Sequence, residues 1–182
     1  MPVEQIRIVR PAGPECPPHL LAQIDAIFFD ASARPPTPGL EREAFRERWL
    51  GRYLHGGTDV VLLALAGEDT VAGYLVGALE DPAKQERFAD IGYFRTHFAE
   101  LTRRFPAHLH VNLAEPFRNR GIGARLIEEF AVTAQQAGAS GMHVVTGRGM
   151  RNVRFYERCG FVERDSAPWK GGEVVFLGRA LL

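Results

Sequence analysis

The stretch that decides the fold is LHVNLAEPFRNRGIGARL, residues 109–126. Apolar and polar residues alternate at its start, which predicts a strand over residues 107–113. The strand passes through a short loop into a helix predicted over residues 121–136. Backbone N–H groups at a helix start are unpaired and the helix dipole is positive there, so this junction suits a phosphate or pyrophosphate.

Glycines and arginines in the loop strengthen the expectation of an anion site. Gly121 and Gly123 lack the Cβ that would hold an anion away from the backbone. Arg118, Arg120 and Arg125 supply local positive charge in a chain whose Lys+Arg and Asp+Glu both number 22. A tight strand-to-helix turn with no ligand is the alternative interpretation of this segment taken alone.

Two common phosphate-binding motifs do not match. A Walker A loop needs Gly-x-x-x-x-Gly-Lys-Ser/Thr, and the sequence contains no such string. A dinucleotide fingerprint needs a third glycine where Leu126 stands, and the pair Gly147 and Gly149 fails in the same way at Asn152. What remains is Arg-x-x-Gly-x-Gly over residues 118–123.

A second motif, NVRFYERCGF at residues 152–161, follows a buried strand predicted over residues 142–146. Together the two stretches resemble motifs A and B of the GNAT superfamily of acyl-CoA-dependent N-acetyltransferases. Residues 118–123 match the first motif. The second motif is matched by Asn152, Tyr156, Gly160 and Phe161.

The resemblance implies one domain over residues 1–182 with an α/β (α+β) fold. Its sheet would be single, mixed, mostly antiparallel and twisted, with helices on both faces and splayed central strands. The order of elements predicted from hydropathy, β-α-α-β-β-α-β-α-β-α-β-β, agrees with this architecture. Its last two strands are expected at residues 161–164 and 173–182, joined by a loop over residues 165–172.

Acetyl-CoA is the cosubstrate that the resemblance implies, and no metal is expected. The pantetheine arm would pair with strand backbone, as an added strand does, and the pyrophosphate would lie on the loop amides. The residues implied in binding are Val111, Leu113, Arg118, Asn119, Arg120, Gly121, Ile122, Gly123, Ala124, Asn152 and Phe155.

Three side chains are candidates for the chemistry. The resemblance points the Tyr156 hydroxyl at the thioester sulfur, where a leaving thiolate develops charge. His108 and His110 alternate onto one face of the strand, and histidine titrates near neutrality, so either could take the proton of an amine. The family often has a Glu on this strand, and none is present; we prefer His110. A core or hydrogen-bonding role is the alternative for each histidine.

Three further side chains carry weaker expectations. Cys159 is expected to be a small buried residue rather than an acyl carrier. His143 is expected to be structural. Trp169, in the predicted loop, is a candidate for a wall of the acceptor site.

A narrower likeness adds a subfamily. Tyr93-Phe94, the stretch FPAHLHVNL at residues 105–113 and His143 resemble bacterial GNAT proteins similar to the acetyltransferase-like domain of O-GlcNAcase. That likeness does not settle the substrate.

Composition limits the location and partners of the chain. It has 182 residues, of which 46% are apolar, and this suffices for one domain with a real core. Two cysteines cannot build a disulfide framework or a four-thiolate zinc site. Zero net charge argues against nucleic-acid and membrane partners. With no targeting segment or membrane-spanning apolar run visible, the expected location is cytoplasmic.

These observations predict transfer of acetyl from acetyl-CoA to a primary amine by direct attack. The acceptor is expected to be a small molecule or a peptide amine, and a homodimer is left open. A non-catalytic CoA-binding module with a regulatory role is the first alternative. A nucleotide-phosphate binder of another class is the second, and the absent Walker lysine argues against it.

Overall fold

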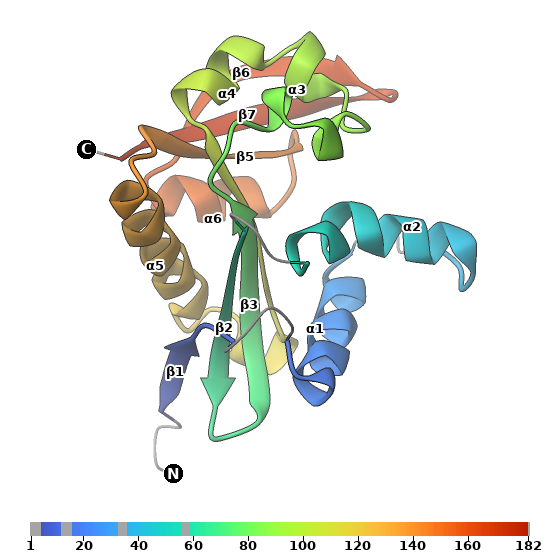
Figure 1. Cartoon of the computed structure of the whole chain (residues 1–182), viewed down its shortest axis with the longest axis vertical. Helices are drawn as coiled ribbons and strands as arrows, with labels where there is room; N and C mark the ends of the chain where they lie inside the picture. The colour runs from blue at the N-terminus through green and yellow to red at the C-terminus, as the bar shows by residue number, and fades with distance from the viewer. Residues whose placement is uncertain (1–4, 12–15, 33–35, 56–58, 182) are drawn as a thin grey trace. The chain divides into compact units, whose positions relative to one another are not determined.

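The computed structural model describes residues 5–11, 16–32, 36–55 and 59–181. The chain divides into two compact units (Figure 1). The first comprises Met1–Gly77 and His110–Phe130, and the second comprises Ala78–Leu109 and Ala131–Leu182.

Strands β1 (Ile6–Val9), β2 (Asp59–Ala66) and β3 (Thr70–Ala78) lie in the first unit, apart from the last residue of β3. β1 and β2 are antiparallel, with Ile6 opposite Ala66. β2 and β3 form the predicted hairpin, whose turn begins at Gly67 with a φ of 66°. Every residue of β2 and all but the first of β3 are buried or half-buried, which explains the two nearly unbroken apolar runs.

Helix α1 (Pro18–Ala31) packs against β3 in the first unit (Figure 1). Its apolar residues recur at helical spacing, and the Gln23 amide ties it to the hairpin. Gln23 Oε1 accepts from the Val71 N–H at 2.9 Å, and Gln23 Nε2 donates to the Asp69 carbonyl at 2.7 Å.

Helix α2 (Leu40–Trp49) is shorter than the helix predicted over residues 41–53. At Leu50 the backbone leaves helical geometry, with a φ of −136°, and the chain continues as the 3₁₀ helix η1 (Gly51–Tyr53). The break buries Leu50 and Tyr53 completely or nearly so, although no residue of α2 itself is fully buried.

The second unit contains three consecutive sheet neighbours, β5 (Gly141–Gly147), β7 (Gly172–Ala180) and β6 (Val162–Trp169). β7 is antiparallel to both β5 and β6. The first residues of β4 (Ala107–Leu113) run parallel to β5, with Ala107 opposite Met142 and His108 opposite His143.

The loop predicted over residues 165–172 is wrong, because β6 continues to Trp169. A two-residue turn at Lys170 and Gly171, with φ values of 46° and 78°, then leads directly into β7. Positive φ at both central residues is the geometry that suits the twist of a tight hairpin. Only Ala167 of β6 is buried, so the strand has no alternating apolar pattern.

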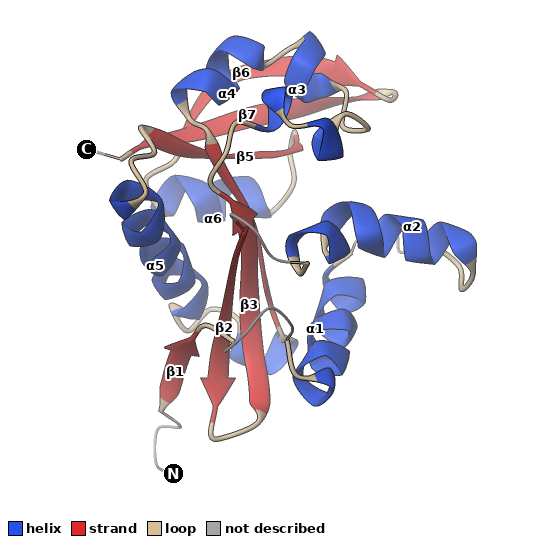
Figure 2. Cartoon of the chain, viewed as in Figure 1, coloured by secondary structure: helices blue, strands red, loops and turns tan. Residues whose placement is uncertain are grey.

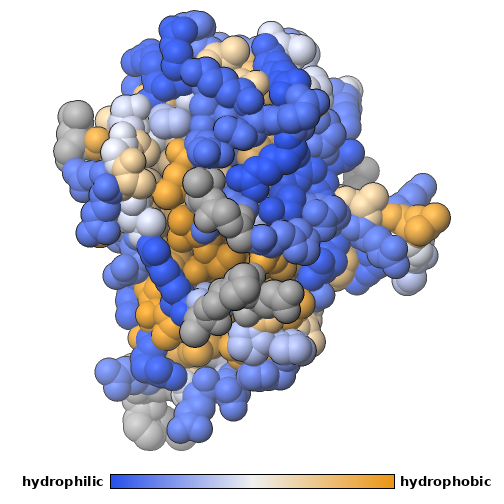
Figure 3. Space-filling model, in the orientation of Figure 1, coloured by the Kyte–Doolittle hydropathy of each residue, from blue (hydrophilic) through white to orange (hydrophobic). Residues whose placement is uncertain are grey.

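Short helices complete the second unit (Figure 2). Their bounds are η2 (Pro82–Lys84), η3 (Glu86–Phe88), α3 (Tyr93–Thr96), α4 (Ala99–Arg104) and α6 (Asn152–Arg158). Phe98 and Phe105 from the helical segment pack on Phe176 of β7, with ring centroids 5.3 and 6.2 Å away. Hydrophilic residues cover the outer side of α3 and α4 (Figure 3).

Helix α5 (Ile122–Gln136) contributes residues to both units. The strand order, written by hydrogen-bonded neighbours, is β1-β2-β3-β4-β5-β7-β6. Because the β4–β5 pair is parallel and the β1–β2, β5–β7 and β6–β7 pairs are antiparallel, this open mixed sheet confirms the predicted fold class. The predicted apolar face of α5 is also confirmed, since all its members are buried: Ile122, Leu126, Ile127, Phe130 and Ala134.

Candidate functional site

The junction between β4 and α5, in the first unit, has the predicted strand–loop–helix form. After Leu113 the chain makes one more sheet hydrogen bond, from the Ala114 N–H to the Ala72 carbonyl at 3.0 Å. It then passes through the 3₁₀ turn η4 (Glu115–Phe117) and enters α5 at Ile122.

The backbone of this loop turns sharply just before the helix. Asn119 and Gly121 have φ values of 61° and 75°, in the left-handed region. A Cβ at Gly121 would meet no atom within 4 Å, so backbone conformation rather than space favours glycine there. The Arg125 N–H makes the hydrogen bond of the first helical turn, to the Gly121 carbonyl at 3.1 Å. The amides before it have no acceptor within the helix, which is the arrangement that binds anions.

The three arginines of the predicted anion site have different surroundings. Arg118 donates from Nε to the Leu113 carbonyl at 3.1 Å and forms an ion pair with Asp30 of α1 at 2.9 Å. Arg118 therefore joins the end of β4 to α1, and Asp30 offsets its charge. Arg120 is exposed, with its guanidinium 5.6 Å from the centroid of the Phe117 ring.

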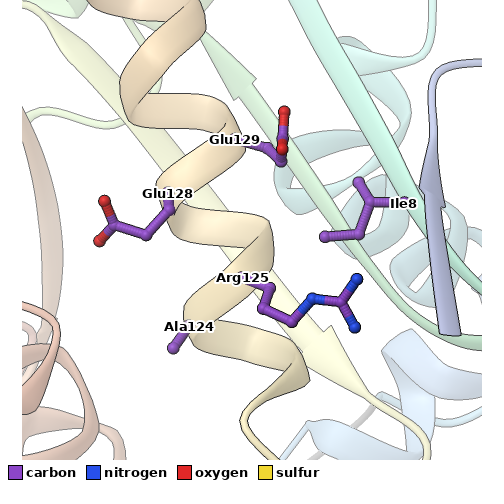
Figure 4. Close-up of a pocket in the computed structure, with 5 residues that line it drawn as sticks. All are labelled: Ile8, Ala124, Arg125, Glu128 and Glu129. Atoms are coloured by element: carbon purple, nitrogen blue, oxygen red, sulfur yellow. The ribbon is translucent and has the colours of Figure 1, made fainter.

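Arg125 faces β1. It donates to the Ile6 carbonyl at 3.1 Å and lines an open pocket of about 430 Å³ between β1 and α5 (Figure 4). Ile8, Ala124, Glu128 and Glu129 complete the lining. Arg125 therefore contacts the edge strand, and two carboxylates lie in the same pocket.

Gly73 on β3 is a residue that sequence reasoning missed. A Cβ at this position would lie 2.2 Å from the Leu113 side chain and 2.8 Å from the Asn112 carbonyl. Only glycine therefore permits β3 and β4 to approach so closely at the end of β4. An isolated glycine inside an apolar strand run was the available signal.

His110 lies half-buried in an aromatic and polar cluster within the first unit. Its Nε2 lies 3.3 Å from the Tyr53 hydroxyl, and the two ring centroids are 5.4 Å apart. The Trp49 ring stands edge-on to His110 at 5.7 Å and 80°. Burial, and then the positive charge of Arg52, lower the pKa of His110 from 6.5 to about 4. The imidazole is therefore neutral at pH 7.

Among the described residues, no group forms a hydrogen bond with Nδ1 of His110. The next side chain on the same face of β4, Asn112, donates from Nδ2 to the Tyr74 hydroxyl at 2.8 Å. Two buried tyrosines thus meet two successive polar side chains of β4. The remaining candidate binding residues of this strand, Val111 and Leu113, are half-buried.

The motif on α6 lies in the second unit. Asn152 accepts a hydrogen bond from the Thr146 hydroxyl at 3.0 Å, which links the start of α6 to the end of β5. Phe155 is half-buried, with its ring 5.2 Å from that of Tyr156. Cys159 is buried, as expected for a small apolar residue.

Tyr156 is 6% exposed and packs against the ring of Phe161 at 5.5 Å. Burial, and then Cys159, raise the pKa of Tyr156 above its usual value, so the phenol is protonated throughout the neutral range. Its hydroxyl has no hydrogen-bond partner among the described residues. A buried phenol without an internal acceptor is able to donate to a ligand.

His108 lies in the aromatic interior of the second unit. Its ring is 4.8 Å from Phe88, 5.9 Å from Phe94 and 5.5 Å from His143. His143 is fully buried, stacks on Phe176 at 4.5 Å and bonds through Nδ1 to the Phe105 carbonyl, which fits the structural role expected for it.

Trp169, expected in a loop, stands at the end of β6 and packs within the second unit. Its ring lies 5.2 Å from Tyr93, and a Cβ on Gly92 would come within 2.8 Å of it. Through these contacts Trp169 packs the β6–β7 hairpin against helix α3. Its prediction as a wall of the acceptor site stays a prediction.

Two kinds of comparison place this geometry among known proteins. Residues 24–161 match the model of the acetyltransferase (GNAT) family. The chain belongs to the GNAT acetyltransferase family. Acetyl transfer from acetyl-CoA is the general chemistry of GNAT proteins, and the match spans both the β4–α5 junction and α6.

Solved GNAT-like structures share the fold at low sequence identity. The structure of SsHAT is 20% identical with a TM-score of 0.70, over 98% of this chain and 99% of the other. A GNAT protein from Desulfovibrio desulfuricans is 17% identical with a TM-score of 0.69, over 98% and 100%. A protein described as a streptothricin acetyltransferase from Bacillus anthracis, in complex with acetyl coenzyme A, is 20% identical with a TM-score of 0.52, over 71% and 66%.

Two other features are absent from residues 5–11, 16–32, 36–55 and 59–181. No three of the His, Cys, Asp and Glu side chains in these ranges are grouped so that they could hold a metal ion. No helix in the same ranges has the length and apolar character needed to cross a bilayer.

Proposed function

We propose that this GNAT protein is an N-acetyltransferase that moves acetyl from acetyl-CoA to a primary amine by direct attack. The observation that carries the proposal is the β4–α5 junction. Asn119 and Gly121 turn the backbone through the left-handed region immediately before α5, and the amides of residues 122–124 have no acceptor within the helix.

The fit of this junction to CoA rests on its donors. We assign the diphosphate to the backbone amides of residues 119–124, because backbone donors and the helix dipole attract a phosphate without a net basic surface. The Arg118 N–H is not among these donors, since it already donates to the Glu115 carbonyl at 3.2 Å. The Arg118 side chain supports the assignment, because it donates to the Leu113 carbonyl and to Asp30 and so holds the loop in place. It is therefore not needed as the main ligand of the diphosphate. Backbone groups of Val111 and Leu113 would take the pantetheine arm, and Asn152 and Phe155 are assigned to CoA binding as well.

Tyr156 is assigned the donor role in the reaction. Acetyl-CoA supplies an electrophilic thioester carbonyl and a thiolate leaving group. The Tyr156 phenol is protonated at pH 7 because burial raises its pKa, and no described residue accepts from its hydroxyl. It is therefore available to hydrogen-bond or protonate a developing thiolate.

His110 is assigned the proton-acceptor role. Its pKa of about 4 means that its ring is neutral and can accept a proton at physiological pH. Such a weak base cannot deprotonate a free ammonium group efficiently. It becomes effective once the attacking nitrogen bonds to carbon, because that nitrogen is then far more acidic. His108 remains a second prediction for this role.

The first test asks which ligand the native chain binds. Thermal unfolding is measured with acetyl-CoA, CoA, ATP and NAD in turn, because a ligand that binds only the native state raises the unfolding temperature. We expect stabilisation by acetyl-CoA and CoA alone. Equal or greater stabilisation by ATP or NAD would contradict the CoA assignment.

The second test asks for catalysis. Thiol release from acetyl-CoA is followed across a panel of small amines, amino sugars, amino acids and peptides with free amino groups. Acetylated product, identified by mass, separates an enzyme from the non-catalytic CoA-binding module that is the alternative. Binding of CoA without transfer to any of these amines would favour the module.

Finer assignments are parts of the same proposal. The acceptor is a small-molecule or peptide amine, and the subfamily likeness to the acetyltransferase-like domain of O-GlcNAcase stays a prediction. A cytoplasmic location, the lack of nucleic-acid and membrane partners, and a homodimer also stay predictions.

A further inference from the structure

The segment formed by α2 and η1 brings three side chains to His110. Trp49 from the end of α2 contacts the imidazole edge-on, and the Tyr53 hydroxyl lies 3.3 Å from Nε2. Arg52, between them in sequence, is the nearby charge that acts on the same ring. The break at Leu50 makes this possible, since it turns the chain out of α2 and buries Tyr53 to 1% exposure.

The two nitrogens of His110 have different environments. Nε2 faces the Tyr53 hydroxyl, whereas Nδ1 has no partner among the described residues. The ring as a whole is only half-buried. In a neutral imidazole one nitrogen carries the proton and the other the lone pair. The Tyr53 hydroxyl can accept from Nε2–H or donate to Nε2, and only the first arrangement leaves the lone pair on Nδ1, as a proton-accepting role at Nδ1 requires.

We propose that Tyr53 is the positioning residue for His110: Nε2–H donates to the Tyr53 oxygen, so that Nδ1 carries the lone pair that faces the acceptor amine. This inference rests on the proposed function, in which His110 accepts the proton. It adds three points to that function: Nδ1 is the His110 nitrogen that accepts the proton, Tyr53 positions the ring, and the acceptor amine approaches from the Nδ1 side.

Packing explains why Tyr53 can hold the imidazole in place. A phenol that is almost completely buried has little rotational freedom, and the T-shaped contacts of Trp49 and Tyr53 restrict the orientation of the imidazole. A ring held this way does not need to be ordered again when the acceptor arrives. Fixed geometry of this kind is a recognised contribution to catalysis.

The chain offers a matched control in Tyr74. It is also 1% exposed, and its hydroxyl also meets a side chain of β4, Asn112, two residues further along the strand. Tyr53→Phe and Tyr74→Phe therefore remove the same atom from equivalent burial, but only the first removes the partner of His110.

The experiment records the ¹⁵N NMR signals of the histidine rings in the full-length chain, for wild type and both variants, at pH 7. We expect the Nε2–H tautomer of His110 in wild type and in Tyr74→Phe, and a mixture of tautomers in Tyr53→Phe. Signals of His110 are assigned by their loss in His110→Gln. This measurement needs no acceptor and no CoA.

Steady-state kinetics with an acceptor from the screen then complete the test. Loss of one neutral hydrogen bond should lower kcat/KM of Tyr53→Phe by roughly tenfold, with a smaller change in Tyr74→Phe. An Nδ1–H tautomer in wild type, or an unchanged tautomer in Tyr53→Phe, would overturn the positioning role whatever the activity.

A lost tautomer preference with full activity in Tyr53→Phe would also overturn it. Failure of the proposed function gives results distinct from failure of the positioning role. In that case His110→Gln would keep full activity, or no amine would be acetylated. The NMR measurement of the His110 tautomer would still test the role of Tyr53.

Discussion

His108 and His110 stand two residues apart on one face of one strand, yet their surroundings share almost nothing. His108 is 3% exposed and lies among Phe88, Phe94 and His143. His110 is half-buried against Trp49 and Tyr53, with one ring nitrogen bonded and the other without a described partner. The period of a strand decides which face a side chain occupies, but the elements packed on that face decide whether it can react.

The largest effect on kcat is expected at Tyr156, and the effects of the two histidine variants are compared with it. Tyr156→Phe keeps the ring and removes the donor, so kcat should fall by roughly 10²–10⁴-fold while CoA affinity is unchanged. Tyr93→Phe is the matched control, because burial also raises the pKa of Tyr93. Wild-type kcat in Tyr156→Phe, measured beside a CoA titration, would remove this residue from the mechanism.

Gly123 tests binding apart from proton transfer. It is buried in the first turn of α5, so Gly123→Asp adds both a side chain and a negative charge where the diphosphate is expected. Affinity for CoA should fall by roughly 10²–10³-fold, since a carboxylate at an anion site repels phosphate. Calorimetry on the folded variant measures this, and Gly123→Ala separates the steric part from the charge. Unchanged affinity would mean that the diphosphate lies elsewhere.

The two histidines are compared directly by substituting each. His110→Gln should lower kcat/KM by about 10²-fold, the lower end for a positioned base, with little change in unfolding temperature. His108→Ala should instead lower the free energy of unfolding by about 2–4 kcal/mol, because it leaves a cavity among aromatic rings. Urea unfolding and kinetics on both variants check this. Loss of activity in His108→Ala at undiminished stability would reverse the roles.

The smallest effect is a dependence of stability on pH. The pKa of His110 is about 4 in the folded chain and 6.5 ordinarily, so the unfolded chain binds more protons between these values. The free energy of unfolding should therefore be constant above pH 6.5 and fall as pH is lowered towards 4. Because the ring is half-buried, we expect this contribution to be about 2 kcal/mol.

Urea unfolding of wild type and His110→Gln at pH 7 and pH 4.5 isolates that contribution. The stability difference between the two proteins should shift in favour of His110→Gln at the lower pH. Parallel pH profiles for the two proteins would show that His110 is not depressed in the folded state.

Sequence patterns predicted the segments whose secondary structure follows from a local hydropathy pattern. The strand at 107–113 and the helix of α5 have strong hydropathy periods, and both are confirmed. A glycine before this helix could be seen in the sequence, but its left-handed conformation could not. The break at Leu50 could not, because Glu41 to Tyr53 has continuous helical spacing and the backbone leaves it only to bury Leu50 and Tyr53.

The environment of each candidate side chain could not be predicted from the sequence either, because tertiary contacts determine it. Nothing local to β4 indicates that Tyr53 meets His110, or that Gly73 allows β3 to approach Leu113. Those contacts join residues that are far apart in the chain. Periodicity places His108 and His110 on one face, and only tertiary packing distinguishes them.

The polar character of β6, which hid residues 165–169 of this strand from its hydropathy pattern, also has a consequence for solubility. β6 is the last strand of the sheet order, and Glu163, Arg164 and Asp165 on it are all exposed. Pro168, near its end, has no N–H to offer to a neighbouring strand. A strand from another molecule that approached this edge would meet charges of both signs and a missing donor. Such edges resist the growth of a sheet from one molecule into the next, and so protect the chain from aggregation through β6.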